Sequence, residues 1–529
     1  MSSLLKFLPF RKAEDTSGEP AVATEQFAEE KISKSPGDSN SVSESLKEDE
    51  VTSVLDPELN PGALALDEDA AGGMGRHLGV FSCTLLIVGR IIGTGIFSTP
   101  SSILGSVGSV GASLMLWVLG SVLSFCGLFI WLEFGTMFPR SGGEKVYLEI
   151  VYQKPRYLAT ILFAANAILL GFTAAGCIVF ASNILVSAGQ EAVIFFVTVL
   201  HGLTPRVGTY LMNALSVFKI VILLFIIVTG MPNFAILRSL AHCAYATATF
   251  KVLFSYGGWS NVNYVMNNVK NPVRTLMIAG PLGLGICVVL NLLANVAYFA
   301  AATKDEIKET GVTVASLFFA NVFGSEAQRA LTVFVALSQR FGTFAVARVN
   351  QELAKEGIPL PFGNRFWASN WPTGKSPLPG LIIHLIPSII VIIAPPPAVA
   401  YPFILDIEGY PQQIINFFVV IGLFWLRWRK PNAVRPFKVW WPLAVFFLAA
   451  AVFLLVAPFL RPANKVGDTP PLPYYLYCLV GIAVMAFGIL YWAAWRIVPG
   501  WFGYELVPRK ETFEDGTVVT LFSTHKKAQ

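Results

Sequence analysis

Two of the long apolar stretches in this chain are interrupted by glycine, and these interruptions limit the possible folds more than any other feature. The first is Gly-Thr-Gly-Ile-Phe at 93–97, and the second is Phe-Ser-Tyr-Gly-Gly-Trp at 254–259. Each glycine destabilises a helix by roughly 1 kcal/mol relative to alanine. Backbone groups freed at such a break are tolerated within a membrane only where they line a polar cavity or lie buried in protein. Either break alone is also compatible with close packing of small residues between helices.

Composition places these stretches in a membrane. The 529 residues are 54% hydrophobic and 13% charged, and the mean hydropathy is +0.61. Soluble domains contain about 25% charged residues. The sequence therefore predicts an all-α membrane protein. Such a protein lies in the lipid bilayer, which is thus one of its expected partners.

Apolar segments of spanning length recur along the chain. A membrane helix needs about 20 mostly apolar residues. We predict twelve transmembrane helices, at 79–100, 110–132, 157–180, 184–203, 210–230, 247–266, 276–301, 330–349, 379–395, 412–426, 440–460 and 473–495.

The distribution of Lys and Arg supports this count. With an N-terminus in the cytosol, the predicted inner loops hold 16 Lys and Arg and the outer loops hold 6. An excess of positive charge marks cytosolic loops. We therefore expect both termini in the cytosol.

The breaks fall in the first and sixth predicted helices. Five helices per half would place them at equivalent positions of a five-plus-five inverted repeat, with two further helices appended. Discontinuous helices at corresponding positions of two repeats point to the binding site of a transporter.

The ends of the chain differ from its centre. Residues 1–77 contain 7 Lys and Arg against 16 Asp and Glu, a net charge of −9, with few aromatic residues. Such a segment cannot bury enough apolar surface to fold. We predict a disordered acidic cytosolic tail at 1–77, a transporter domain at 78–497 and a cytosolic C-terminal tail at 498–529.

The first break suits the carboxylate of a small zwitterion. The N-terminal end of a half-helix offers free N–H groups and the positive end of its dipole. Gly93, Thr94 and Gly95 would supply these groups, since glycine permits close approach of the backbone.

The second break suits the ammonium group. The C-terminal end of a half-helix offers free carbonyl groups, which Phe254, Ser255 and Gly257 would supply. Phe254 would also gate the bound substrate, and Trp259 would wall its side-chain pocket. Both rings are equally compatible with simple packing.

Two cationic residues lie deep in predicted helices. Lys219 is ten residues into 210–230, too far from either interface for its side chain to reach water. Burial disfavours a charged amine, so Lys219 would titrate during transport, or would be a structural amine bonded to helix carbonyls. Arg90 would face a wet vestibule or organise the break.

Nothing at membrane depth points to an enzyme. The six cysteines form no metal-ligand spacing and no disulfide framework. No nucleophile–base pair occurs there, Glu133 is expected to pair with cations of the inner loops, and His201 and His384 are expected to be packing residues. We predict no catalytic residue, metal, cofactor or nucleic-acid partner.

Several motifs in order resemble the amino acid–polyamine–organocation superfamily, and within it the L-type amino acid transporter branch. They are Gly93–Pro100, Glu133–Gly135 followed by Pro139–Gly143, Phe254–Trp259, Asn271–Arg274 and Arg348–Ala354. The last two are similar to the fungal high-affinity methionine permeases. The resemblance covers roughly residues 76–510.

The resemblance implies site residues and partners. It implies that backbone N–H groups of Thr94 and Gly95 hold the carboxylate, and that Ile91 joins Phe254, Ser255 and Gly257 in holding the ammonium. It implies that Lys219 replaces a sodium site. Fungal members resemble proton-driven plasma-membrane importers regulated by ubiquitin, and the N-terminal acceptors here would be Lys6, Lys12, Lys31, Lys34 and Lys47.

The chain departs from this pattern in three places. Residues 181–190 lack the cysteine that tethers a glycoprotein heavy chain in animal relatives, so we expect no disulfide-linked partner. Asn267 and Asn268 stand where acidic residues are usual. The eighth helix looks shortened and contains Gln339 and Arg340, so altered splicing has impaired it or it tilts and buries Arg340 in a wet cavity.

These observations predict a secondary active transporter that imports neutral L-amino acids across the plasma membrane with protons. Methionine is the favoured substrate, followed by cysteine. An amino acid exchanger is the first alternative, because exchange and proton symport use the same binding site. A non-transporting amino acid sensor is the second, if the eighth helix is impaired.

Overall fold

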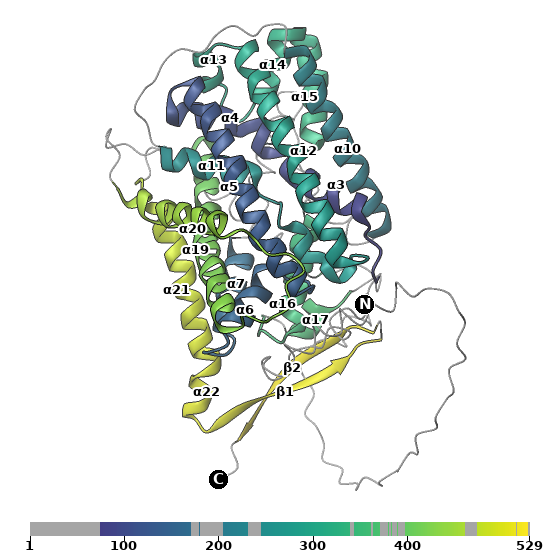
Figure 1. Ribbon diagram of the computed structural model, residues 1–529, viewed down its shortest axis with the longest axis vertical. Helices are drawn as coiled ribbons and strands as arrows, with labels where there is room; N and C mark the ends of the chain where they lie inside the picture. The colour runs from purple at the N-terminus through teal and green to yellow at the C-terminus, as the bar shows by residue number, and fades with distance from the viewer. Residues whose placement is uncertain are drawn as a thin grey trace, which may run out of the picture. The chain divides into compact units, whose positions relative to one another are not determined.

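Helices and one C-terminal β-hairpin form the regular structure of the described part of the chain (Figure 1). The computed structural model describes residues 75–170, 205–230, 245–338, 343–360, 363–370, 397–460, 473–514 and 516–526, together with positions 179, 379, 382 and 389. The chain divides into two compact units, Met1–Glu58 and Leu59–Gln529, and every described residue belongs to the second.

The elements follow one another without a central sheet. In chain order they are α3 (Val80–Ile91), α4 (Thr94–Val107), α5 (Val110–Met137), α6 (Glu144–Val151), α7 (Leu158–Leu169), α10 (Pro205–Gly230), α11 (Tyr245–Tyr256), the 3₁₀ helix η4 (Asn261–Asn268), α12 (Pro272–Ala301), α13 (Lys304–Glu309), α14 (Val314–Phe323), α15 (Ser325–Ser338), α16 (Thr343–Lys355), α17 (Asn364–Ala368), α19 (Pro397–Arg429), α20 (Trp441–Val456), η5 (Ala457–Phe459), α21 (Leu476–Arg496), α22 (Val498–Trp501), β1 (Tyr504–Thr512) and β2 (Val518–Lys526).

Six of the described helical segments are long and apolar enough to cross a membrane. They are Val80–Val107, Val110–Met137, Pro272–Ala301, Phe403–Arg429, Trp441–Phe459 and Leu476–Trp501. Shorter apolar helices cover Leu158–Leu169, Asn213–Thr229 and Val314–Phe323. The predicted span 184–203 and almost all of 379–395 lie outside the described residues, as do Gln339, Arg340, His201 and His384.

Both predicted breaks are present. α3 ends at Ile91 and α4 begins at Thr94, so the first break consists of Ile92 and Gly93. α11 ends at Tyr256, and η4 begins at Asn261 after a turn. Within that turn Gly258 has a φ of +123°, a conformation that favours glycine.

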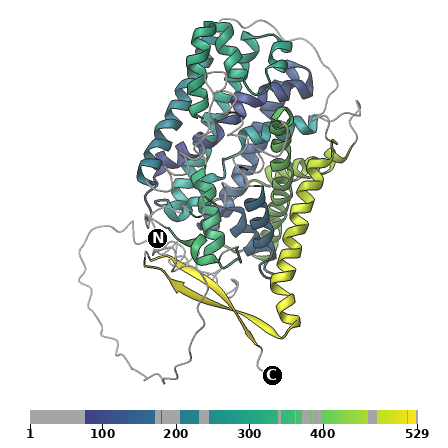
Figure 2. The same ribbon diagram turned by 180° about the vertical axis from the view of Figure 1, so that it is seen from behind.

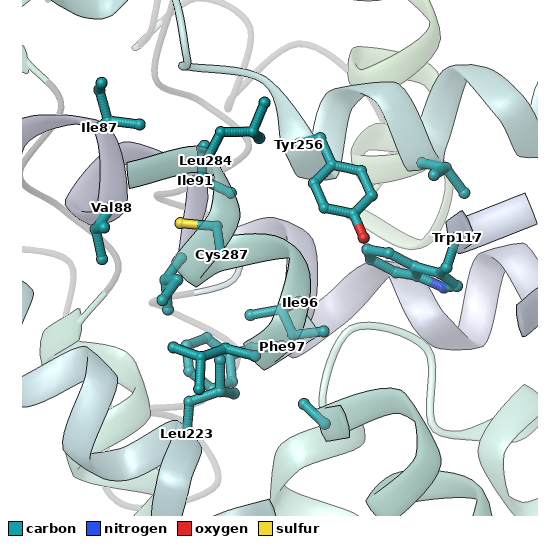
Figure 3. Packing of buried hydrophobic residues seen from close by; sticks show 14 of the residues in the cluster. Ile87, Val88, Ile91, Ile96, Phe97, Trp117, Leu223, Tyr256, Leu284 and Cys287 are labelled. Atoms are coloured by element: carbon teal, nitrogen blue, oxygen red, sulfur yellow. The ribbon is translucent and has the colours of Figure 1, made fainter. Parts of the chain in front are cut away.

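The largest apolar core packs the two halves of the first broken helix against their neighbours (Figure 3). α3 contacts α10 and α12, and α4 contacts α11. Ile91, Phe97, Leu223 and Cys287 are all buried in this core. Tyr256 stands edge-on to the ring of Trp117 of α5, with ring centroids 5.5 Å apart.

The C-terminal region is structured where the sequence predicts only a tail. β1 and β2 pair antiparallel from Tyr504↔Lys526 to Thr512↔Val518. The hairpin contacts α16 and α17. It lies at the end of this unit opposite α13, α14 and α15, as both views show (Figures 1 and 2).

Candidate functional site

The beginning of α4 and the end of α11 are in close contact. A Cβ atom on Gly95 would lie 2.6 Å from the Cα of Ser255, a distance that side chains do not reach. The two hydroxyl groups of Thr99 and Ser255 hydrogen-bond each other at 2.7 Å. One hydroxyl donates to the other, and the accepting hydroxyl donates its own proton to a carbonyl, that of Gly95 if it is Thr99 or that of Lys251 if it is Ser255. The Gly-x-Gly segment is therefore both a break and a packing contact.

This contact brings opposite helix ends together. The first N–H groups of α4, from Thr94 onward, have no acceptor within their own helix. The last carbonyl groups of α11, up to Tyr256, have no donor within theirs. A helix carries partial positive charge at its N-terminus and partial negative charge at its C-terminus. The pair can therefore hold an anionic and a cationic group of one small molecule side by side.

The carbonyl groups at the end of α3 are divided among different partners. The Val88 carbonyl accepts from the Ile92 N–H at 2.8 Å. The Gly89 carbonyl accepts from the Nζ of Lys219 at 2.7 Å. Lys219 is 1% exposed, so α10 caps the broken end of α3 with a buried amine. Ile91, the last residue of α3, is also buried.

The turn after α11 is organised by glycine. The Gly257 N–H donates to the Phe254 carbonyl at 2.9 Å, which engages one of the carbonyls predicted to hold an ammonium. A Cβ atom on Gly258 would lie 2.3 Å from the Cγ of Arg90. The stem of Arg90 thus packs on the second break, while its side chain is exposed. Arg90 therefore connects the end of α3 with the second break.

Phe254 and Trp259 of the second break have different neighbours. Phe254 is half-buried and packs against a cluster formed mainly by α19 and α21, which includes Tyr401, Leu405 and Tyr477. Trp259 stands edge-on to Trp131 of α5, with centroids 5.2 Å apart. Trp259 therefore packs against α5.

The structure adds Glu408 to this region. Glu408 lies on α19, and its carboxylate interacts electrostatically with the guanidinium of Arg90. Arg90 also interacts with Lys219, but there the two positive charges repel each other. Sequence analysis missed Glu408 because the predicted tenth helix begins at 412, whereas α19 begins at Pro397.

Glu133 forms ion pairs, as predicted. It is fully buried at the end of α5. It accepts from the Nε of Arg427 at 3.0 Å and lies 3.3 Å from the Nε of Arg435. The Val439 N–H donates to it at 2.8 Å. Glu133 therefore fastens α5 to the α19–α20 connection.

The end of the bundle near η4 is closed by polar contacts. Asn267 accepts from the Ser141 N–H at 3.2 Å, and its own N–H donates to the Ser141 hydroxyl at 3.0 Å. The buried Lys145 of α6 forms an ion pair with Glu356, which follows α16. Asn267 thus contributes neutral hydrogen bonds at this end of the bundle.

No group of three or more potential metal ligands occurs among the residues that the structure describes. Two broken helices pack within one apolar bundle, and their breaks bring free backbone groups together. This arrangement is that of a helical membrane transporter. Solved structures show the same fold: a manganese transporter from Eremococcus coleocola matches with a TM-score of 0.52 and 13% identity, covering 81% of this chain and 98% of that one.

The chain belongs to the amino acid permease family, whose match extends over residues 78–484. It is 36% identical over 478 residues to the high-affinity methionine permease of Saccharomyces cerevisiae, covering 83% of each chain. It is 32% identical to the low-affinity methionine permease of the same yeast, covering 84% of this chain and 87% of that one. It is 28% identical to the human b(0,+)-type amino acid transporter 1, covering 77% and 86%.

Proposed function

We propose that this protein is a secondary active transporter that imports neutral L-amino acids across the plasma membrane, with methionine favoured and protons as the coupling ion. The observation that carries the proposal is the approach of Gly95 to Ser255, because it sets the N-terminus of α4 beside the C-terminus of α11. Two methionine permeases among the relatives support the substrate. Cysteine is the second candidate substrate.

In this proposal the substrate is held by main-chain groups. The N–H groups at Gly93, Thr94 and Gly95 bind its carboxylate. The carbonyl groups of Ile91 and of the last turn of α11 bind its ammonium, with Phe254, Ser255 and Gly257 forming that second end. Such groups replace the lost water of both charges without placing a full charge in the membrane.

The side chains of the second break shape the pocket. Phe254 is half-buried between the break and α19, a position from which its ring can cover a bound substrate as a gate. Trp259 contributes to the wall on the side of α5. A thioether is apolar and flexible, so it suits a pocket with aromatic walls.

Lys219 takes part in coupling. Its ammonium group reaches the open end of α3 and supplies one positive charge where a sodium ion would otherwise bind the same carbonyl groups. A charged lysine makes a stronger hydrogen bond than a neutral amine does, so loss of its proton would weaken the bond to the Gly89 carbonyl and ease its release. This release would link a proton to the position of α3.

The architecture proposed for the whole chain has twelve spans, with a five-plus-five inverted repeat containing both breaks. The transporter domain occupies 78–497, and the acidic tail 1–77 and the segment 498–529 are cytosolic. The N-terminal tail is the proposed target of ubiquitin ligases. No disulfide-linked heavy chain is required in this proposal.

Uptake of radiolabelled methionine tests the function. The full chain is expressed in cells that lack their own permeases, and uptake is measured with and without a proton uncoupler. Accumulation above the external concentration that collapses with the uncoupler is the expected result. Uptake that needs internal amino acid and ignores the uncoupler identifies an exchanger, and binding without uptake identifies a sensor.

A further inference from the structure

Glu408 is an acidic residue within the second half of the bundle that the proposed substrate clamp does not use. Its Oε1 atom is shielded from solvent and has no hydrogen-bond partner among the described residues. A shielded carboxylate oxygen without a donor is costly when the group is ionised, unless an opposite charge compensates it. Ionisable residues inside membrane proteins commonly mark ion or proton pathways.

Arg90 supplies the opposite charge. It projects from the end of α3, packs its stem on Gly258, and interacts electrostatically with the Glu408 carboxylate on α19. A guanidinium group stays protonated in proteins, so only the carboxylate of this pair can change its charge. The two groups therefore connect the first broken helix to α19 through an interaction that one proton would switch off.

The other titratable groups near Glu408 have interactions of their own and do not disrupt its pairing with Arg90. On α19 itself the Tyr401 hydroxyl, two turns earlier, interacts with Glu408. Lys251 of α11 donates instead to the Ser106 hydroxyl of α4 at 3.1 Å. Asp406 interacts with Cys478 of α21.

Helices α5 and α6 also contact α19. Charged side chains of these two helices form ion pairs with residues other than Glu408. Glu133 of α5 pairs with Arg427 and Arg435. Lys145 of α6 pairs with Glu356 and lies 3.6 Å from Glu149. Among the described residues, Arg90 is the oppositely charged group whose interaction with Glu408 is established.

We propose that Glu408 is a protonation site that acts together with Lys219 in coupling substrate movement to protons, with Arg90 as its charge partner. The carboxylate takes a proton from water on the outer side and becomes neutral, which releases Arg90. It returns the proton to water on the inner side and attracts Arg90 again. Because Arg90 packs on Gly258, movement of Arg90 would shift the second break and so the proposed substrate clamp. This proposal rests on the proposed proton-coupled import. Lys219 of α10 then acts on Arg90 through its own positive charge.

Glu408→Gln tests the proposal because glutamine resembles the neutral acid but cannot release a proton. Purified parent and variant are reconstituted into liposomes. Methionine accumulation is measured with an imposed pH gradient, and methionine counterflow is measured at equal pH on both sides. One coupled proton supports about a tenfold concentration ratio per unit of pH gradient, because each factor of ten has the same free energy in both gradients. The variant is expected to lose this accumulation and to keep counterflow.

Two further variants complete the test. Glu408→Asp keeps the carboxyl group and is expected to recover part of the accumulation. Glu326→Gln, at an exposed position of α15, removes a carboxylate elsewhere and is expected to behave like the parent.

Two results for Glu408→Gln would overturn the proposal: accumulation equal to that of the parent between pH 5 and 8, or loss of counterflow together with accumulation. The second would show that Glu408 serves substrate binding or assembly. A parent protein that fails to accumulate methionine under any gradient would instead contradict the proposed function.

Discussion

The Nζ of Lys219 in α10 lies 2.7 Å from the carbonyl oxygen of Gly89, two residues before the end of α3. The same turn of α10 holds Ser216, whose Oγ would lie 2.2 Å from a Cβ atom on Gly89. Lys219 can reach the α3 carbonyl because glycine leaves the helices close together. The buried amine and the broken helix therefore form one unit.

Lys219→Ala should abolish the pH dependence of methionine accumulation. The substitution removes the cation and leaves the Gly89 carbonyl without its donor, which costs roughly 1–3 kcal/mol for a buried group. Uptake between pH 5 and 8 measures the effect, with Arg329→Ala at an exposed position as the control. Equal uptake by Lys219→Ala and the parent at every pH would contradict a coupling role for Lys219.

Gly95→Ala should reduce methionine uptake strongly. The new methyl group would meet the Ser255 backbone at 2.6 Å, so α4 and α11 would have to separate, at a cost of about 1–3 kcal/mol for overpacking. Gly105→Ala is the matched control in the same helix, since nothing lies within 4 Å of its Cβ position. Initial uptake rates and thermal unfolding in detergent distinguish the two variants, and equal behaviour would refute the close contact.

Glu133→Gln should lower thermal stability. It leaves Arg427 and Arg435, which are 10% and 7% exposed, without their carboxylate. Removing one partner of a buried ion pair costs about 3–5 kcal/mol. Unfolding in detergent measures the loss, and adding Arg435→Gln should recover part of it by removing one unpaired charge. No change in stability on Glu133→Gln would contradict the ion-pair cluster.

Acid should loosen the start of α13. Glu306 accepts hydrogen bonds from the backbone N–H and the hydroxyl of Thr303, both at 2.8 Å, and these bonds hold the pKa of Glu306 below its usual 4.5. Because the folded pKa is lowered, the cap is fully present above the unfolded pKa and is lost as pH falls through the folded value.

A spin label introduced by Lys308→Cys would report this change. Its mobility should stay low at neutral pH and rise as the pH falls through the lowered pKa of Glu306. Glu306→Ala carrying the same label should be mobile at every pH. A pH-dependent step that persists in that variant would assign the change to another group.

The breaks were predictable because glycine in an apolar helix is a local signal. The residues 93–97 and 254–259 locate both interruptions, although the first lies at Ile92 and Gly93 and leaves Gly95 in the first turn of α4. The pairing of Glu133 with inner-loop cations was predictable from burial and charge alone. Lys219 was identified by its depth, but its bond to Gly89 was not, since that contact joins residues 130 positions apart.

Other features depend on contacts that the sequence pattern does not encode. Glu408 was missed because polar residues near the start of α19 interrupt its hydropathy, so the predicted helix began too late. The sequence predicts a loop where α14 lies, between the spans 276–301 and 330–349, because the apolar run of α14 is short. The β-hairpin was read as a tail, because its strands pack against α16 and α17, which are distant in the chain. The side of Trp259 could not be chosen without knowing that Gly127 leaves room for its ring.

The proposed clamp at Gly95 and Ser255 would consist of peptide groups, which every amino acid in the chain possesses. Point mutations can therefore do little to change which charged ends of a ligand are recognised, unless they disturb the helix crossing itself. Side chains on the surrounding helices can vary freely without that risk. In the proposed site, substitutions on the surrounding helices would therefore change the preferred amino acid side chain more readily than the recognition of the amino and acid ends.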